Sequence, residues 1–338
     1  MIPIMNRRVV LVLAVLLSFS FLIMVVDAHI PKVPDDGTTI GTATEIIDPW
    51  KSWFYHSQLD AGEIQYYSFE ANQGERIRFM LKVPIPEGDR GVAPGLVLMG
   101  ASVADQGTHP SGLEVPVGAG VIVIPPDTLE AEYEGFTPLS QYTSVDLNMS
   151  APSTGTFYVA VFAGSTGGRY ALVTGYVEAY DLLQWITVPS MAITIMMWSG
   201  ESLLFILLIM FLPLIIGLVL LAIRQKSIFS KERALTLIGA MGGLLILGSS
   251  FSFFIQMILS LLQAPYNWTV IVSLVFITIP SVLSLAVLRT VNSEAWENKR
   301  GKKITLVLIG IVAPFVWAGL YLGPILVFVS GIMPLVKQ

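Results

Sequence analysis

Three histidines are the side chains in this sequence best suited to bind a transition metal, because the chain contains no cysteine. They are His29, His56 and His109. Val26 and Ala28 have the small or apolar character found before a signal-peptidase cut, and cleavage after Ala28 would give His29 a free amine beside its imidazole. Such nitrogens suit copper or zinc. The spacing of the three residues is not diagnostic, so separate surface histidines are the competing interpretation.

Carboxylates offer a second kind of metal site, for calcium. Acidic residues occur in the turns PDDG at 34–37 and PEGDRG at 86–91, and glutamates alternate in EAEYEG at 130–135. Their oxygen atoms are the ligands that Ca²⁺ prefers. None of the three stretches matches an EF-hand, and turn chemistry explains the first two without a metal. We therefore expect no resident cofactor, with copper and calcium as the alternatives.

Aromatic side chains are unusually dense in DPWKSWFYHS, at residues 48–57. Trp50, Trp53 and Tyr55 could form a surface that contacts a ligand such as a glycan. Aromatic residues in strands also pack across strands in a core or at an edge. The sequence leaves both interpretations open for this stretch.

Motifs for catalysis are missing. The chain has no Gly-x-Ser-x-Gly, no His-Glu-x-x-His, no P-loop and no cysteine nucleophile, and GSTGG at 164–168 is a hairpin turn. Two glycosylation sequons begin at Asn148 and Asn267. Asn148 is the expected acceptor, since Asn267 lies next to an apolar run. The sequence therefore favours a non-catalytic protein.

Composition identifies the class of protein that must position these residues. Of the chain, 54% is hydrophobic and 13% charged, with a mean hydropathy of +0.72. Soluble domains carry about 25% charged residues, so this is a membrane protein. The net charge is −12 over residues 29–190 and +6 beyond residue 190. The acidic half would repel phosphates, which excludes nucleic acid as a partner.

The N-terminal segment directs export. Arg7 and Arg8 precede an apolar run, so residues 1–28 are expected to be a cleaved signal peptide. The run is nearly long enough to span a bilayer, and a retained anchor is therefore the alternative. Either one would place the following residues outside the cell.

Four further apolar runs are each long enough to cross a bilayer. They are Ser202 to Ile223, Ala234 to Leu262, Trp268 to Leu288 and Ile304 to about Val329. The last is broken by prolines and could instead be a kinked helix followed by an interfacial tail. Loops 224–233 and 289–303 are basic, which predicts that they are cytoplasmic and that the C-terminus is outside.

Ionisable residues are absent from the middle of these runs, which argues against a proton-coupled transporter. Gln256 is the most polar interior residue, and we interpret it as an interhelical hydrogen-bonding group. Gly239 and Gly243 have the spacing that lets helices pack closely.

The exported half alternates apolar and polar residues with period two, as in EIQYYSFEA and TFYVAVFA. Turn signals separate these runs, which predicts an antiparallel sandwich of about eight or nine strands, of the jelly-roll or immunoglobulin-like sort. The expected domains are an extracellular sandwich at 29–180, an interfacial linker at 181–201 and a four-helix transmembrane domain at 202–338.

Two blocks of sequence resemble the bacterial pre-peptidase C-terminal type of β-sandwich. They are LDAGEIQYYSFEANQGERIRFML and SAPSTGTFYVAVFAGSTGGRYALVTG. The matching positions are glycines and aromatic residues: Gly62, Tyr66, Tyr67, Phe69, Gly74, Gly155, Phe157, Tyr158, Gly168 and Tyr170. The resemblance implies an accessory module for binding or stabilisation, without shared catalytic residues. Here a membrane bundle replaces the peptidase, and the whole chain is similar to uncharacterised archaeal and bacterial surface membrane proteins.

These observations predict a membrane-anchored cell-surface protein whose external sandwich binds a ligand or a partner, in contact with the lipid bilayer. A glycan, an envelope component or a membrane subunit would be the partner. Two alternatives remain. One is an exported copper-binding protein that uses His29, and the other is an accessory subunit of a membrane transporter or envelope enzyme.

Overall fold

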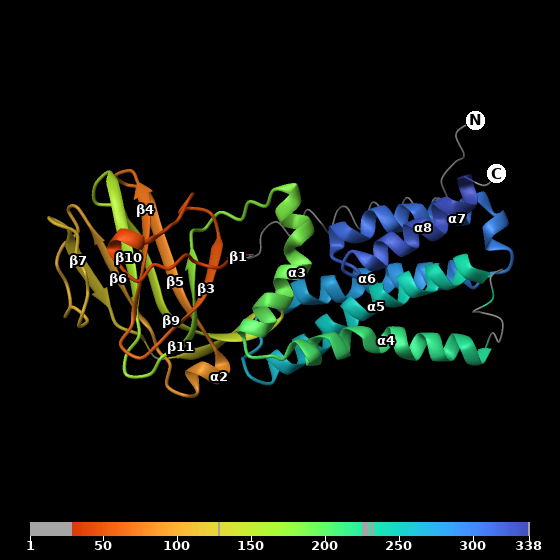
Figure 1. The fold of residues 1–338 in the computed structure, drawn as a ribbon, viewed down its shortest axis with the longest axis horizontal. Helices are drawn as coiled ribbons and strands as arrows, with labels where there is room; N and C mark the ends of the chain where they lie inside the picture. The colour runs from red at the N-terminus through yellow and green to blue at the C-terminus, as the bar shows by residue number, and fades with distance from the viewer. Residues whose placement is uncertain (1–28, 128, 225–229, 231–232, 337–338) are drawn as a thin grey trace.

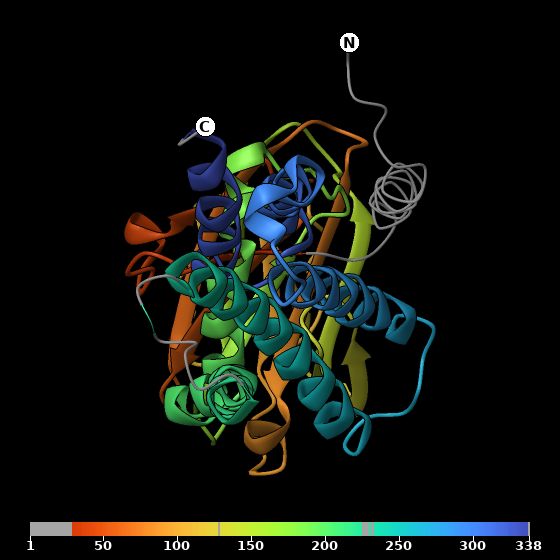
Figure 2. The same cartoon turned by 90° about the vertical axis from the view of Figure 1, so that its right-hand side faces the viewer.

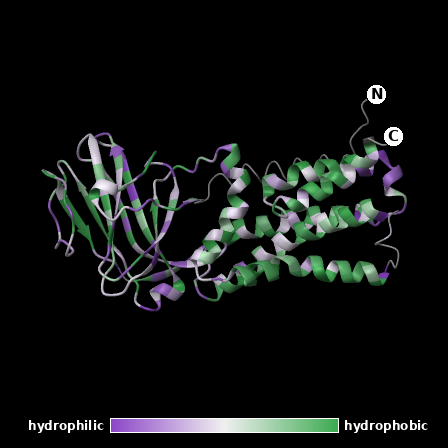
Figure 3. Cartoon of the chain, in the orientation of Figure 1, coloured by the Kyte–Doolittle hydropathy of each residue, from purple (hydrophilic) through white to green (hydrophobic). Residues whose placement is uncertain are grey.

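A computed structural model describes residues 29–127, 129–224, 230 and 233–336. A β-sandwich occupies one end, a bundle of helices extends from it, and helix α3 lies between the two (Figure 1). Apolar residues are concentrated in the bundle, and hydrophilic residues gather in the sandwich and at the far end of the helices (Figure 3). The predicted signal peptide or anchor, at residues 1–28, lies outside the described residues.

The sandwich consists of two sheets. The first has six strands in the order β1 (Ile30–Lys32), β3 (Trp53–Leu59), β11 (Gly168–Thr174), β5 (Arg76–Pro84), β9 (Leu139–Ser150) and β8 (Glu130–Glu134). The second has five in the order β2 (Thr44–Glu45), β4 (Ile64–Ala71), β10 (Gly155–Phe162), β6 (Gly95–Gly100) and β7 (Gly120–Ile124). The described residues thus form eleven strands, more than the eight or nine expected. The sheets are mixed rather than antiparallel, because short β1 and β2 pair in parallel with β3 and β4.

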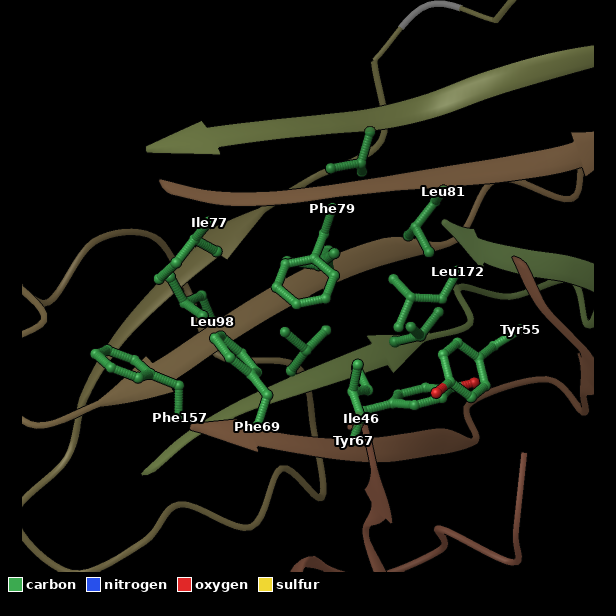
Figure 4. Close-up of a cluster of buried hydrophobic side chains, with 14 of the residues drawn as sticks. Ile46, Tyr55, Tyr67, Phe69, Ile77, Phe79, Leu81, Leu98, Phe157 and Leu172 are labelled. Atoms are coloured by element: carbon green, nitrogen blue, oxygen red, sulfur yellow. The ribbon is translucent and has the colours of Figure 1, made fainter. Parts of the chain in front are cut away.

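Aromatic and aliphatic side chains together fill the space between the sheets (Figure 4). Alternation along β4 turns Tyr67 and Phe69 inward, and the ring of Phe69 stacks on Phe157 at a centroid distance of 5.6 Å. The hydroxyl groups of Tyr67 and Tyr170 are hydrogen-bonded to each other at 2.9 Å. Each hydroxyl thus has a partner inside the core, where water cannot supply one. These residues belong to the blocks that carry the sequence resemblance.

Helix α3 (Leu182–Trp198) covers the outer face of the six-stranded sheet. Asp181 caps it by accepting a hydrogen bond from the backbone N–H of Gln184 at 2.7 Å. At the other end of the helix, the Trp198 ring packs edge-on against Phe54, and its indole N–H donates to the Tyr170 carbonyl at 3.0 Å. The six-stranded sheet is therefore buried on both faces along β3 and β11.

Among the residues that the structure describes, three helices are long and apolar enough to cross a membrane: α4 (Leu203–Arg224), α5 (Ala234–Leu261) and α6 (Val270–Val291). Helix α4 packs against α5 and α3 and forms the edge of the bundle. In Figure 2 it is the green helix seen end-on at the lower left. Shorter helices in the described part of the chain include α2 (Ile85–Gly88), η2 (Ile40–Thr42) and η4 (Trp296–Asn298).

The predicted fourth span, Ile304 to about Val329, is not one helix. It divides into α7 (Arg300–Val312), η5 (Ala313–Val316) and α8 (Leu322–Val336). Pro314 and the left-handed residues Trp317 and Gly319 reverse the chain. The two helices are antiparallel, so α8 ends near the start of α7, at the end of the bundle away from the sandwich. This corrects the expectation that the C-terminus lies on the sandwich side.

The turn between β8 and β9 anchors the sandwich to α5 and α6. Ser140 donates through its hydroxyl to the Ser260 carbonyl at 2.7 Å, and the Ser260 hydroxyl donates to the Pro138 carbonyl at 3.1 Å. The Ser273 hydroxyl donates to the Gly135 carbonyl at 2.6 Å. Because these serines are buried, their bonds fix the turn against the helices.

Candidate functional site

A cleft of about 160 Å³ opens at one edge of the sandwich, where the ends of several strands meet. Trp50 stands before β3, Tyr176 follows β11 and Arg76 begins β5. The backbone N–H groups of Tyr176 and Val177 both donate to the Trp50 carbonyl at 2.9 Å, which holds the two aromatic walls together. Gly175 makes this approach possible, because a Cβ there would lie 2.4 Å from the Trp50 carbonyl oxygen.

The cleft combines flat rings with groups of both charges. The Arg76 guanidinium lies 5.0 Å from the centroid of Tyr176, and its Nε donates to the Asn148 side-chain oxygen at 2.9 Å. The Glu75 carboxylate accepts from the Asn72 side chain at 2.9 Å and from the Asn72 backbone at 2.7 Å, and these bonds lower the pKa of Glu75. Rings beside fixed donors and acceptors can hold a polyhydroxylated ligand.

The aromatic residues singled out from the sequence divide between this cleft and the core. Trp50 is 43% exposed and lines the cleft, whereas Trp53 and Tyr55 are 5% and 2% exposed. The Nζ atoms of Lys32 and Lys51 lie over the ring of Trp53, at 3.7 and 4.6 Å from its centroid. Trp53 and Tyr55 therefore pack within the sandwich, and of the three only Trp50 presents a ring to solvent.

Tyr176 and Arg76 were not identified from the sequence. Tyr176 is 43% exposed, the same fraction as Trp50. No spacing could pair position 50 with position 176, because the pairing depends on the parallel bridge between Lys51 and Val177. The sequon residue Asn148 is exposed on β9 and reaches the cleft through its bond to Arg76.

The histidines lie in different parts of the sandwich. His29 is hydrogen-bonded to Ser52 and stacks on Phe54, and His56 lies on β3 opposite Ala171. Burial lowers the pKa of His56. His109 lies in the connection between β6 and β7, in the other sheet. In the part of the chain that the structure describes, no three His, Cys, Asp or Glu residues are placed to hold a metal ion.

An ion cluster around the buried carboxylate of Glu87 lies next to α3. Glu87 is 2% exposed and accepts from Arg169 Nε at 2.8 Å, with an ion pair to Arg90 on its other oxygen. The Arg169 guanidinium also donates to the Met197 carbonyl near the end of α3, at 3.1 Å. This cluster therefore ties the first sheet to the helix that leads into the bundle.

Neither a family model nor a curated protein sequence matches the chain. Among solved structures it is similar to the pre-peptidase C-terminal domain of a collagenase from Bacillus anthracis, with 15% sequence identity and a TM-score of 0.20. That match covers 38% of this chain and 91% of the collagenase domain. The described strands and helices establish a β-sandwich followed by a helical region, of which three helices can cross a membrane.

Proposed function

We propose that this protein is a membrane-anchored cell-surface protein whose sandwich, on the outer side, binds a ligand in the cleft beside Trp50 and Tyr176. The sandwich and the basic residues around 289–303 lie at opposite ends of the apolar helices, which supports an external sandwich by the positive-inside rule. The buried serine contacts hold the sandwich in one orientation on the bundle.

The observation that carries this proposal is the pair of half-exposed rings. Large aromatic side chains are normally mostly buried, and both walls of the cleft leave 43% of the residue in solvent. Arg76 and Glu75 add a fixed donor and a fixed acceptor beside them. An envelope glycan is the ligand class that uses both features, through ring stacking and hydroxyl hydrogen bonds.

The test uses full-length protein in detergent on an array of envelope glycans. Trp50→Ala and Tyr176→Ala should each weaken binding at least about tenfold, since each removes one wall. Tyr266→Ala is the matched control, because Tyr266 is 72% exposed in the connection between α5 and α6. Unchanged binding by variants with native thermal unfolding would reject the cleft as the ligand site.

The orientation of the protein in the membrane can be tested by cysteine labelling, because the sequence contains no cysteine and an introduced one is labelled without background. Glu45→Cys lies at an exposed position on β2 in the sandwich, and Glu294→Cys lies at the far end of the bundle. A membrane-impermeant maleimide should label the first variant on intact cells and the second only after permeabilisation. The reverse pattern would overturn the external placement.

The accessory-subunit alternative is supported by α4. Its buried residues are Ile206, Ile209 and Met210, so much of this apolar helix is left for lipid or for the helix of a partner. Purification in detergent followed by mass spectrometry distinguishes an independent receptor from an accessory subunit. A stoichiometric partner that is lost when the α4 surface is changed, as in Leu208→Trp, would favour a subunit over an independent receptor.

A further inference from the structure

A second cavity, of about 320 Å³, lies where the sandwich meets the bundle. Its walls come from the start of α2, the start of β9, the α3–α4 connection with the first turn of α4, and the end of α5 with the residues that follow it. This cavity is separate from the cleft beside Trp50 and shares no lining residue with it. It is therefore a second candidate site, independent of the first.

The lining of this cavity includes polar side chains and one carboxylate. The Glu201 carboxylate accepts a hydrogen bond from the Gln256 side-chain nitrogen at 2.6 Å, and Gln256 is 2% exposed. Gln256 thus bonds to the chain segment between α3 and α4 rather than to a neighbouring span. Among the described residues that line the cavity, Glu201 is the one with a formal charge.

The surroundings of Glu201 raise the pKa of its carboxyl above the ordinary value. Burial raises the pKa of this carboxyl, and the hydrogen bond from Gln256 opposes that rise. A cation placed in the cavity would favour the ionised carboxylate. The hydroxyl groups of Ser140 and Ser260 already donate to backbone carbonyls, which leaves Glu201 as the strong acceptor.

The lining also includes apolar side chains that are partly exposed on the surface of the helices. Phe205, Leu259 and Leu262 line it and are 39%, 37% and 78% exposed. Phe205 and Leu259 belong to α4 and α5, two of the helices that can cross a membrane. The cavity lining thus combines a carboxylate with apolar side chains on helices that hydrocarbon chains would cover.

We propose that this cavity binds the headgroup of a membrane lipid that carries an ammonium group, with the ammonium at Glu201 and the lipid chains leaving past Phe205 and Leu262. Carboxylate and ammonium form a charge-assisted hydrogen bond, which is strong where water is displaced. The volume is at the lower end of small-molecule sites, about 300–1,000 Å³, so it suits a headgroup and leaves the chains in the bilayer.

The test measures lipid that stays with the purified protein. Full-length protein is reconstituted with equal phosphatidylethanolamine and phosphatidylglycerol, extracted in mild detergent and analysed by mass spectrometry. The unmodified chain should retain phosphatidylethanolamine in at least about tenfold excess. Glu201→Gln, which keeps the size of the side chain, should abolish that preference, whereas Glu294→Gln at the far end of the bundle should keep it.

Two results would overturn the proposal. One is equal retention of both lipids by the unmodified chain, which does not depend on the folding of any variant. The other is an undiminished preference in Glu201→Gln. Glycan binding should be the same in the Glu201→Gln variant and the unmodified chain, since Glu201 lies outside the Trp50 cleft, so failure of one proposal leaves the other standing.

Discussion

Glu87→Gln is the substitution that most directly tests how the sandwich is joined to α3. The Glu87 carboxylate is buried and faces two guanidinium groups, and the amide replaces one acceptor oxygen with a donor. Arg169 would then lose a charged partner at 2.7 Å while it remains 28% exposed. Because Arg169 also donates to the Met197 carbonyl, the loss should loosen the end of α3.

The size of the effect follows from the burial of the two pairs. Breaking a buried ion pair costs about 3–5 kcal/mol, and an exposed pair contributes less than about 1 kcal/mol. The Arg90 side chain is 67% exposed, so its pair with Glu87 adds little to the stability. The Arg169 side chain is 28% exposed, so the loss of its pair should cost less than a fully buried pair would. We expect the free energy of unfolding to fall by about 2–3 kcal/mol, which for a domain of this size lowers Tm by about 4–12 °C.

Thermal unfolding in detergent, followed by tryptophan fluorescence, measures this change. Glu45→Gln makes the same chemical change at an exposed position on β2 and should leave Tm unchanged. A Glu87→Met, Arg169→Met double variant should lose less stability than the two single variants together, because neither charge is then left alone. If Glu87→Gln unfolds within about 1 °C of the unmodified chain, the cluster does not stabilise the junction.

Two further predictions concern the turn and the buried histidine. Gly135→Ala should lower the free energy of unfolding by about 1–3 kcal/mol and speed hydrogen exchange in the β8–β9 turn, because the added Cβ would lie 2.1 Å from the Thr269 carbonyl oxygen. Gly164→Ala is the control, because a Cβ at that position would meet no atom within 4 Å. The pKa of His56 is lowered from 6.5 in the folded chain, so the unfolded chain binds more protons and stability falls as pH drops below about 6.5. His56→Asn should make that decline shallower, by at most about 1.4 kcal/mol per pH unit in denaturant titrations, and an unchanged slope would contradict the assignment.

The interior strands of the sandwich could be predicted from the sequence because successive side chains point to opposite faces of a sheet, which gives these runs a period of two. The alternating runs EIQYYSFEA and TFYVAVFA correspond to β4 and β10, which pair antiparallel along their whole length. Edge strands β1 and β2 have three and two residues, too few for a periodic pattern to emerge. They also pair in parallel, which depends on contacts made by distant parts of the chain.

The aromatic run in β3 shows why exposure was harder to predict than strand position. Phe54 faces α3, while Trp53 and Tyr55 face the other sheet, so three consecutive residues are all buried. A sheet with one solvated face would have exposed one side of this run. The sequence does not reveal that α3 covers that face, and so Trp50 could not be separated from its neighbours.

Hydropathy also could not distinguish a single span from the α7–α8 hairpin. Both are apolar over the same residues, and the difference arises from the reversal near Trp317 and Gly319. Gly310 packs against Phe328, and Gly331 packs against Leu306, so small residues allow the two helices to lie close together. Glycine and proline are frequent in membrane helices, and their presence alone does not predict a turn.

The reversal between α7 and α8 also bears on the order in which the molecule is assembled. The Trp317 ring stacks on Phe276 at 4.4 Å and meets Phe136 of the sandwich edge-on at 4.5 Å, and its indole N–H donates to the Trp185 carbonyl of α3. A ribosome makes all three of those residues before it reaches Trp317. The contacts by which Trp317 joins the sandwich, α3 and α6 can therefore form only after all three of those parts have been synthesised.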